Sequence, residues 1–204
     1  MFNNFGDYSC IVYSKSPTVN ISAKSGLAIG GIAGLIGSLV MLPYMFAVNL
    51  ETNSPNIFNF QIVNVILFDN NLTAATVIGL AMHFAAGALI GMIFGAIIVR
   101  DRFLPKSIGN GISWGIVAGA TSFAGLFVPT MAYLPKATVT MMHIEVPSMP
   151  MQAIEQMVQS STGMILNSSL LDHVLYGSVL GAVTTILLFK KYHYAESMKQ
   201  TSGN

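Results

Sequence analysis

The sequence predicts an all-α integral membrane protein in which four transmembrane helices form two parallel hairpins with long outer loops. Hydrophobic residues make up 53% of the 204 residues and charged residues only 8%, whereas soluble domains carry roughly 25% charged residues. The formal net charge of +1 gives no electrostatic basis for binding nucleic acid. Membrane lipid is therefore the partner that this composition predicts.

Four stretches with almost no charge supply the predicted transmembrane helices. Each reaches the roughly 20 residues that a helix needs to cross a hydrocarbon core of about 30 Å. A membrane-spanning β-strand needs only about 9–11 residues, and a helix bonds all its backbone groups internally, as lipid requires. The stretches are about 25–50, 73–99, 109–134 and 167–189.

The distribution of lysine and arginine predicts the orientation of these helices. Eight of the nine basic residues would lie on one side of a four-span protein, and only Lys136 would lie on the other. Because cytoplasmic loops retain the excess of positive charge, both termini and the loop 100–110 are predicted to be cytoplasmic. The loops 51–72 and 135–166 would face outward, in a multi-pass protein of the plasma membrane.

An internal repeat divides the predicted membrane domain into two hairpins. The second and fourth spans both contain His-x-x-x-Gly-x-x-x-Gly, which begins at His83 and again 90 residues later at His173. The first and third spans share Gly-x-x-x-Gly, which begins at Gly30 and again 85 residues later at Gly115. Parallel repeats are related by an axis along the membrane normal, so a four-helix bundle with pseudo-twofold symmetry is expected. The predicted divisions are an N-terminal tail at 1–24, a membrane domain at 25–190 with repeats at about 25–100 and 109–190, and a C-terminal tail at 191–204.

Glycines recur at every fourth position on each predicted span, and they predict how the helices pack. Small residues let helix backbones approach closely in lipid, where the hydrophobic effect between helices is weak. An alternative is that the small residues line a narrow permeation path. The predicted packing residues are Gly30, Gly34, Gly87, Gly91, Gly95, Gly115, Gly119, Gly177 and Gly181.

His83, His173 and Asp172 are the candidate functional polar residues. Each histidine lies 17 residues before a cytoplasmic basic residue, so both are expected at one depth, about 25 Å from that end of the helix. Ionisable residues inside a membrane usually face the bundle interior. The imidazoles would either bond across helices to a hydroxyl or carbonyl, or act together as ligands or a proton relay. Asp172 has no acidic counterpart beside His83, which suggests a more polar role for the second repeat.

The outer loop 135–166 is rich in methionine and contains a histidine, a combination of soft ligands that suits copper. A copper site would need a third ligand for the two intramembrane histidines, from this loop or from Met41, Met45 or Met131. No metal motif has this spacing, and methionine also serves as adaptable packing. Pro150 predicts the start of a short amphipathic helix over 150–163 on the outer surface. The candidate metal ligands are His83, His173, His143, Met141, Met142, Met149 and Met151.

Motifs for common enzyme chemistry are missing from the sequence. It has no Gly-rich phosphate loop, no His-Glu-x-x-His and no nucleophile with a base at a fixed spacing. A non-catalytic membrane protein without a resident cofactor, copper apart, is therefore predicted.

The paired His-x-x-x-Gly-x-x-x-Gly helices resemble those of small uncharacterised four-span membrane proteins of bacteria and archaea, over residues 26–190. The composition is also similar to that of membrane proteins of ammonia-oxidising archaea, with low charge, many Met, Ile and Asn residues and a Met- and His-bearing outer loop. The copper membrane monooxygenase of those archaea, the ammonia monooxygenase, includes small accessory helical subunits. That resemblance implies an archaeal accessory subunit without catalytic residues.

Three functions remain open from the sequence. The first, favoured by the missing chemistry and the glycine-rich helices, is a structural or assembly subunit associated with other membrane subunits. The second is a small transporter or channel for a neutral or small solute, suggested by the duplication and the intramembrane histidines. The third is a copper-handling membrane protein.

Overall fold

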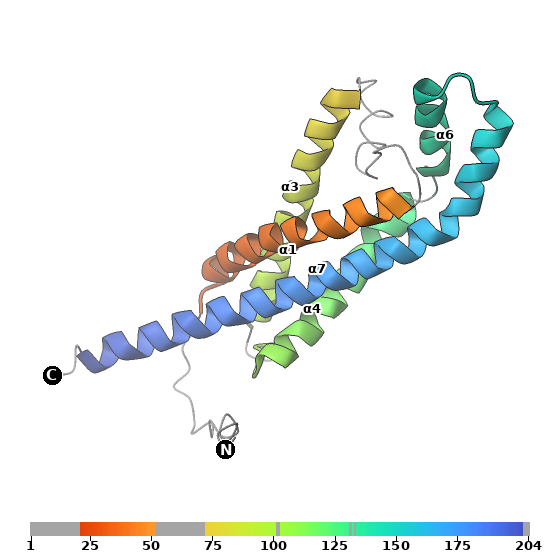
Figure 1. Cartoon of the computed structure of the whole chain (residues 1–204). Coiled ribbons are helices and arrows are strands. Elements are labelled where there is room, and N and C mark those ends of the chain that lie inside the picture. The colour runs from red at the N-terminus through yellow and green to blue at the C-terminus, as the bar shows by residue number, and fades with distance from the viewer. Residues whose placement is uncertain (1–20, 52–71, 101–102, 131, 133, 202–204) are drawn as a thin grey trace, which may run out of the picture.

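The computed structural model of the chain describes residues 21–51, 72–100, 103–130, 132 and 134–201, and every element within them is helical (Figure 1). Four helices are long and apolar enough to cross a membrane, over Ala23–Ala47, Thr76–Ile98, Ile108–Thr130 and Thr162–Lys191. The predicted all-α, four-span fold is thereby confirmed, and the chain is a multi-pass membrane protein. The elements are α1 Ala23–Glu51, α3 Leu72–Ile98, α4 Ile108–Ser122, the π-helix η1 Phe123–Phe127, α5 Val128–Thr130, α6 Leu134–Glu145 and α7 Met151–Thr201.

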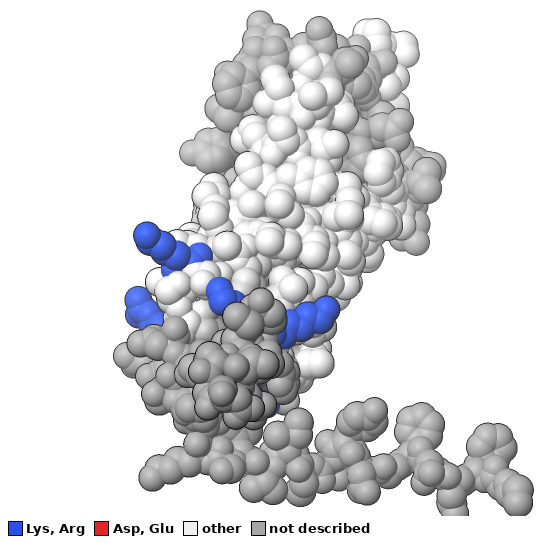
Figure 2. All heavy atoms as spheres, turned by 90° about the vertical axis from the view of Figure 1, so that its left-hand side faces the viewer, with Lys and Arg blue, Asp and Glu red and all other residues white. Residues whose placement is uncertain are grey.

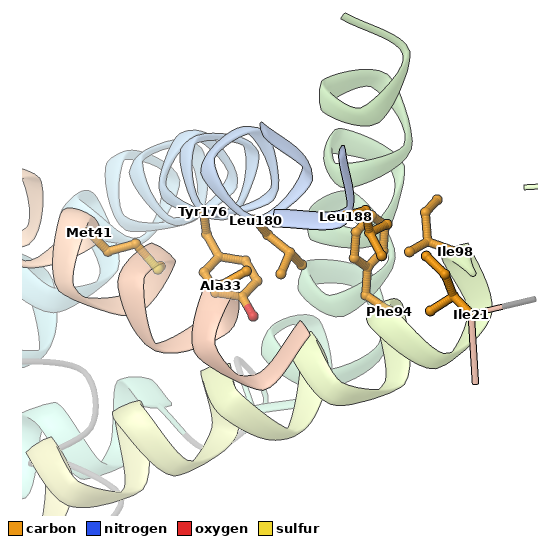
Figure 3. Packing of buried hydrophobic residues seen from close by; sticks show 8 residues of the cluster. All are labelled: Ile21, Ala33, Met41, Phe94, Ile98, Tyr176, Leu180 and Leu188. Carbon is orange, nitrogen blue, oxygen red and sulfur yellow. The ribbon is translucent and has the colours of Figure 1, made fainter. Parts of the chain in front are cut away.

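The four spans associate as two pairs, α1 with α3 and α4 with α7, and α1 also packs along α7. The core where the pairs meet is apolar, and Leu180 and Leu188 in it are fully buried. Tyr176 of α7 lies beside Met41 and Ala33 of α1 in this core (Figure 3). Close packing of such side chains supplies the dispersion energy that holds helices together in lipid.

Large aliphatic side chains cover the outer surface of the spans. Ile93 is 61% exposed, Leu89 is 56% exposed and Val117 is 54% exposed. An exposed apolar surface of this extent is unusual for a soluble monomer, and it is what a helix needs where it faces acyl chains.

The basic residues gather at one end of the bundle. Figure 2 shows lysine and arginine side chains on that face and no acidic side chain among the described residues there. Lys191 donates from Nζ to Ser25 Oγ at 2.6 Å, which ties the start of α1 to the late part of α7. Lys136 lies apart from this group, on α6. The side of the membrane that this basic end faces stays a prediction. The exposed basic residues at this end are Lys24, Arg100, Lys106, Lys190 and Lys191.

The region 135–166 is mostly helical and is not a long loop. Helix α6 packs against the first turns of α7 and buries Met142, Ile154 and Val158 (Figure 1). The separate surface helix predicted over 150–163 is wrong, because α7 runs without interruption for 51 residues into the fourth span. The polar residues after residue 158 suggest, from the sequence, that a helix ends there. Gly163 is the poorest helix former among them, and it destabilises a helix by only about 1 kcal/mol. The other outer loop, over 52–71, lies outside the described residues.

Candidate functional site

A cavity of about 280 Å³ lies between the two helix pairs, within the candidate spans. Both intramembrane histidines line it, together with Asp172 and the thioethers of Met41 and Met45. Among the residues that the structure describes, no lysine or arginine lines it. The full lining is Ser38, Met41, Met45, Met82, His83, Ala86, Gly87, Ile90, Ser122, Leu126, Phe127, Thr130, Ser169, Asp172, His173 and Tyr176.

Glycines bring the backbones of each pair into contact and so set the walls of the cavity. A Cβ added to Gly30 would collide with the carbonyl oxygen of Gly91, and one added to Gly34 would collide with that of Gly87. Gly95 faces the carbonyl of Gly26 in the same way. Any side chain at these positions would force α1 and α3 apart.

The pair α4 and α7 makes corresponding contacts. A Cβ on Gly115 would collide with the carbonyl oxygen of Gly177, and one on Gly119 would collide with that of His173. Gly181 in turn faces the carbonyl of Gly111. Each predicted packing glycine thus lies against the backbone of the partner helix of its own pair.

The register of these contacts differs from the register of the sequence motif. Gly30 and Gly115 are 85 residues apart, and the carbonyls that they face, those of Gly91 and Gly177, are 86 apart. The His-x-x-x-Gly-x-x-x-Gly motifs are 90 residues apart, one helical turn more. In the packing register His173 therefore corresponds to Gly87. The carbonyl of Gly87 faces Gly34 in the first pair, and the carbonyl of His173 faces Gly119 in the second.

The expectation that both histidines lie at one depth stays a prediction, and both line the same cavity. In the packing register alone, their positions are offset by one turn, about 5.4 Å along the helix. Because the glycines recur every four residues, the two spans can be aligned at offsets that differ by one helical turn, and glycines match in both alignments. The sequence alone therefore suggested the longer of the two offsets. The residue that corresponds to His83 in the second pair is Ser169, which also lines the cavity.

Each histidine bonds to a backbone carbonyl. Nε2 of His83 lies 3.0 Å from the carbonyl oxygen of Ser38 on α1, and Nδ1 of His173 lies 2.7 Å from that of Ser169 on its own helix. A carbonyl oxygen only accepts, so these ring nitrogens carry the proton, and the other nitrogen of a neutral ring is an acceptor. Burial in an apolar span favours the neutral ring.

A π-helix shapes the cavity wall on the third span. The amide of Val128 donates to the carbonyl of Phe123, which closes the wider turn. Phe123 and Phe127 stack at 5.4 Å, and their centroids lie 5.5 and 5.8 Å from the ring of His173. Such bulges occur frequently at functional sites. In the sequence the one sign of this π-helix is Pro129, which cannot donate a helical hydrogen bond.

Two buried oxygens beside the cavity have no hydrogen-bond partner among the described residues. They are Oγ of Ser38, in a residue 1% exposed, and Oδ1 of Asp172, in a residue 7% exposed. An unmet buried polar group costs about 1–3 kcal/mol, so both indicate a polar ligand or water in the cavity. The importance of Ser38 was not apparent from the sequence.

Tyr176 joins the two helix pairs at the cavity. Its hydroxyl donates to the carbonyl oxygen of Gly87 at 2.6 Å. Its ring packs on α1, where a Cβ at Gly37 would come within 2.8 Å of the ring. This contact depends on glycines in both α1 and α3, and sequence analysis did not single it out.

The outer metal candidates lie away from the cavity. Met142 is buried between α6 and α7, His143 and Met151 are exposed, and Met149 lies in the turn between the two helices. Met141 lies on α6, and Met131 falls outside the described residues. Within the described ranges, no three His, Cys, Asp or Glu side chains are grouped closely enough to hold a metal ion. Of the predicted copper ligands, the structure brings His83 and His173 together with Met41 and Met45.

No protein-family model, curated protein or solved structure matches this chain. Of the two family resemblances, the four spanning helices are the part that the structure supports. The functional proposal therefore rests on the cavity and the helices that line it.

Proposed function

We propose that the protein binds a small solute in the cavity between its helix pairs and moves it across the membrane. The observation that carries this proposal is the pair of buried, unpartnered oxygens of Ser38 and Asp172 at membrane depth. Polar and ionisable groups inside a membrane are costly and commonly mark a solute pathway. A purely structural subunit needs tight helix contacts but gains nothing from a polar cavity.

The helix pairs supply the parts that such a pathway needs. Within each pair, backbone-to-backbone glycine contacts favour movement as one body. Between the pairs, the hydrogen bonds from Tyr176 to Gly87 and from Lys191 to Ser25 and the packing of α1 on α7 hold the two bodies together. Rocking of one pair against the other would open the cavity to each side in turn, as in transporters built from repeats.

Apolar packing separates the cavity from the basic end. Phe94, Ile98 and Leu188 cluster there with Ile21, away from Met41 and Tyr176 beside the cavity (Figure 3). Phe103 and Trp114 contact each other edge to face at 5.3 Å, and both pack against the same core. This cluster would be the gate that opens toward the basic end.

Flux in proteoliposomes tests the proposal. We expect faster uptake of at least one small solute among urea, glycerol and propylammonium than in empty liposomes. Ala86→Leu, which fills the cavity, should lower the rate at least fivefold. Ala85→Leu is the matched control, because Ala85 is exposed and does not line the cavity. Absence of flux for every solute, or equal loss in both variants, would overturn the proposal.

A structural or assembly role is a second candidate, favoured by the outer part of the molecule. Helix α6 and the first turns of α7 lie outside the candidate spans, and Met151 and Met157 there are 42% and 39% exposed. Exposed methionines suit an adaptable contact with another subunit, and the archaeal ammonia monooxygenase is the complex that the composition suggests. Native mass spectrometry of solubilised membranes should then find a stoichiometric membrane partner, and a lone monomer or homodimer would argue against this role.

For the orientation we propose that the basic end faces the cytoplasm, because positive charge is retained there. A single cysteine at Ser148, in a Cys10→Ser background, should react with an impermeant maleimide added to intact cells. A cysteine at Ser107, exposed at the start of α4, should react only after lysis. The reverse pattern would invert the orientation.

A further inference from the structure

We infer, on the basis of the proposed function, that the cavity binds a small organic amine as its cation, with the ammonium group held by Asp172. Three features of the lining support this ligand class: where its protons point, where its one carboxylate lies, and what covers the rest of the wall.

Most hydroxyl and imidazole protons around the cavity point to backbone carbonyls, whereas the hydroxyl of Ser38 has no partner among the described residues and can donate or accept. Oγ of Ser122 donates to the carbonyl of Gly119 at 2.8 Å, and Oγ1 of Thr130 donates to that of Phe127 at 2.6 Å. Tyr176 donates to Gly87 at 2.6 Å, and Nδ1 of His173 bonds to the carbonyl of Ser169 at 2.7 Å.

Because these protons are already hydrogen-bonded to carbonyls, the same side chains can act mainly as hydrogen-bond acceptors toward a ligand in the cavity. Nε2 of neutral His173 is an acceptor, as are the hydroxyl oxygens and the carboxylate of Asp172. A lining that offers mainly acceptors recognises a ligand that carries several donors. An ammonium group supplies up to three N–H donors and no acceptor.

Asp172 selects for positive charge. It is the one acidic residue of the lining, is 7% exposed, and has an unpartnered Oδ1. An ionised carboxylate buried without a partner is costly, and pairing with a cation offsets that cost. Among the described residues no lysine or arginine lines the cavity, and both imidazoles there are neutral, so the ligand supplies the cation.

The remaining wall fits an apolar body. Phe127, Leu126 and Ile90 line the cavity with the two thioethers of α1. The ring of Phe127 can also attract a cation over its face, which is worth about 0.5–2 kcal/mol. A ligand with one charged end and a short alkyl chain satisfies both parts of this wall.

Calorimetry on the full chain in nanodiscs, with empty nanodiscs subtracted, tests the inference with three probes of one shape: propylammonium, propanol and propionate. We expect propylammonium to bind at least tenfold more tightly than propanol, and propionate not to bind. Asp172→Asn should remove that preference and leave propanol binding within twofold. Glu155→Gln, an exposed change on α7 outside the spans, should alter neither.

The wild-type comparison needs no variant, so the test survives if Asp172→Asn fails to fold. Propanol binding equal to or tighter than propylammonium binding would overturn the amine and leave a solute cavity in place. Stoichiometric copper(I) that displaces propylammonium and is lost in a His83→Ala, His173→Ala variant would overturn it in favour of a metal ion. No binding of any probe, together with no flux, would overturn both the ligand class and the proposed function.

Discussion

The two helix pairs share a packing scheme and differ in what they present to the cavity. In α1 and α3 the helices are regular, and His83 bonds across the pair to the carbonyl of Ser38. In the other pair the third span is interrupted by η1, and His173 bonds within α7. At the position that Gly87 occupies in the first pair, the second pair has His173.

This difference shows how one backbone scheme can serve two tasks. Gly87 leaves room for Ser38 within the first pair, and its carbonyl accepts the hydroxyl of Tyr176 from the second pair. His173 and Asp172 instead project side chains of their own beside the cavity. The shared glycines supply close packing, and the residues in which the two pairs differ line the cavity.

The largest expected effect is the loss of either pair when a packing glycine is enlarged. Gly91→Leu and Gly181→Leu each place a side chain against a backbone carbonyl, those of Gly30 and Gly111. We expect each to lower the unfolding free energy by at least about 3 kcal/mol, at the upper end of what overpacking costs. Denaturation in mixed detergent micelles measures this.

Leu89→Ala is the control for both variants, because Leu89 is 56% exposed on the lipid-facing side of α3. Its loss should stay below about 1 kcal/mol, since little packing is removed. Similar losses in all three variants would mean that the glycine rows do not hold the pairs together.

A smaller effect is expected at the buried hydrogen bond between the pairs. Tyr176→Phe keeps the ring but leaves the carbonyl of Gly87 without its donor at 2.6 Å. The unfolding free energy should fall by about 1–2 kcal/mol, because a buried acceptor then lacks a partner. Ser178→Ala, which removes a bond within α7 to the carbonyl of Val174, should cost less. The opposite ranking would show that the pairs are held by packing alone.

The smallest effect is a gain in stability in the second pair. Thr184 is fully buried, and its hydroxyl has no partner among the described residues. In the packing register it corresponds to Ile98, an apolar residue of the first pair that is 2% exposed. Thr184→Val makes the second pair resemble the first and should raise the unfolding free energy by about 1 kcal/mol. A loss would indicate an unseen polar partner for Thr184.

The spans were predictable because low charge over a sufficient length is a property of each segment alone. The glycine rows followed for the same reason, since a period of four places residues on one face of a helix. The register between helices was not predictable, because a period of four fits several offsets. The continuity of α7 was missed because Ser, Thr and Gln after Val158 lower hydropathy without breaking a helix.

The site was predictable only in part. His83, His173 and Asp172 stood out because polar groups are rare in such spans, and Met41 and Met45 were foreseen as their neighbours. The contributions of Ser38, Tyr176 and η1 depend on how α1, α3 and α7 meet in space. A serine, a tyrosine or a proline in an apolar segment has several common roles, so the sequence does not show how these three helices contact one another.

The spacing of the glycine rows has a consequence for how the chain assembles after insertion. Sliding α3 along α1 by one turn would still place two of the three glycine contacts over glycines, so the glycine rows by themselves permit an off-register pair. Larger residues end the row on α3, His83 at one end and Val99 at the other. His173 and Thr185 end the row on α7. We therefore expect these larger residues to oppose a slip in either direction, with the histidine beside each row favouring the native alignment.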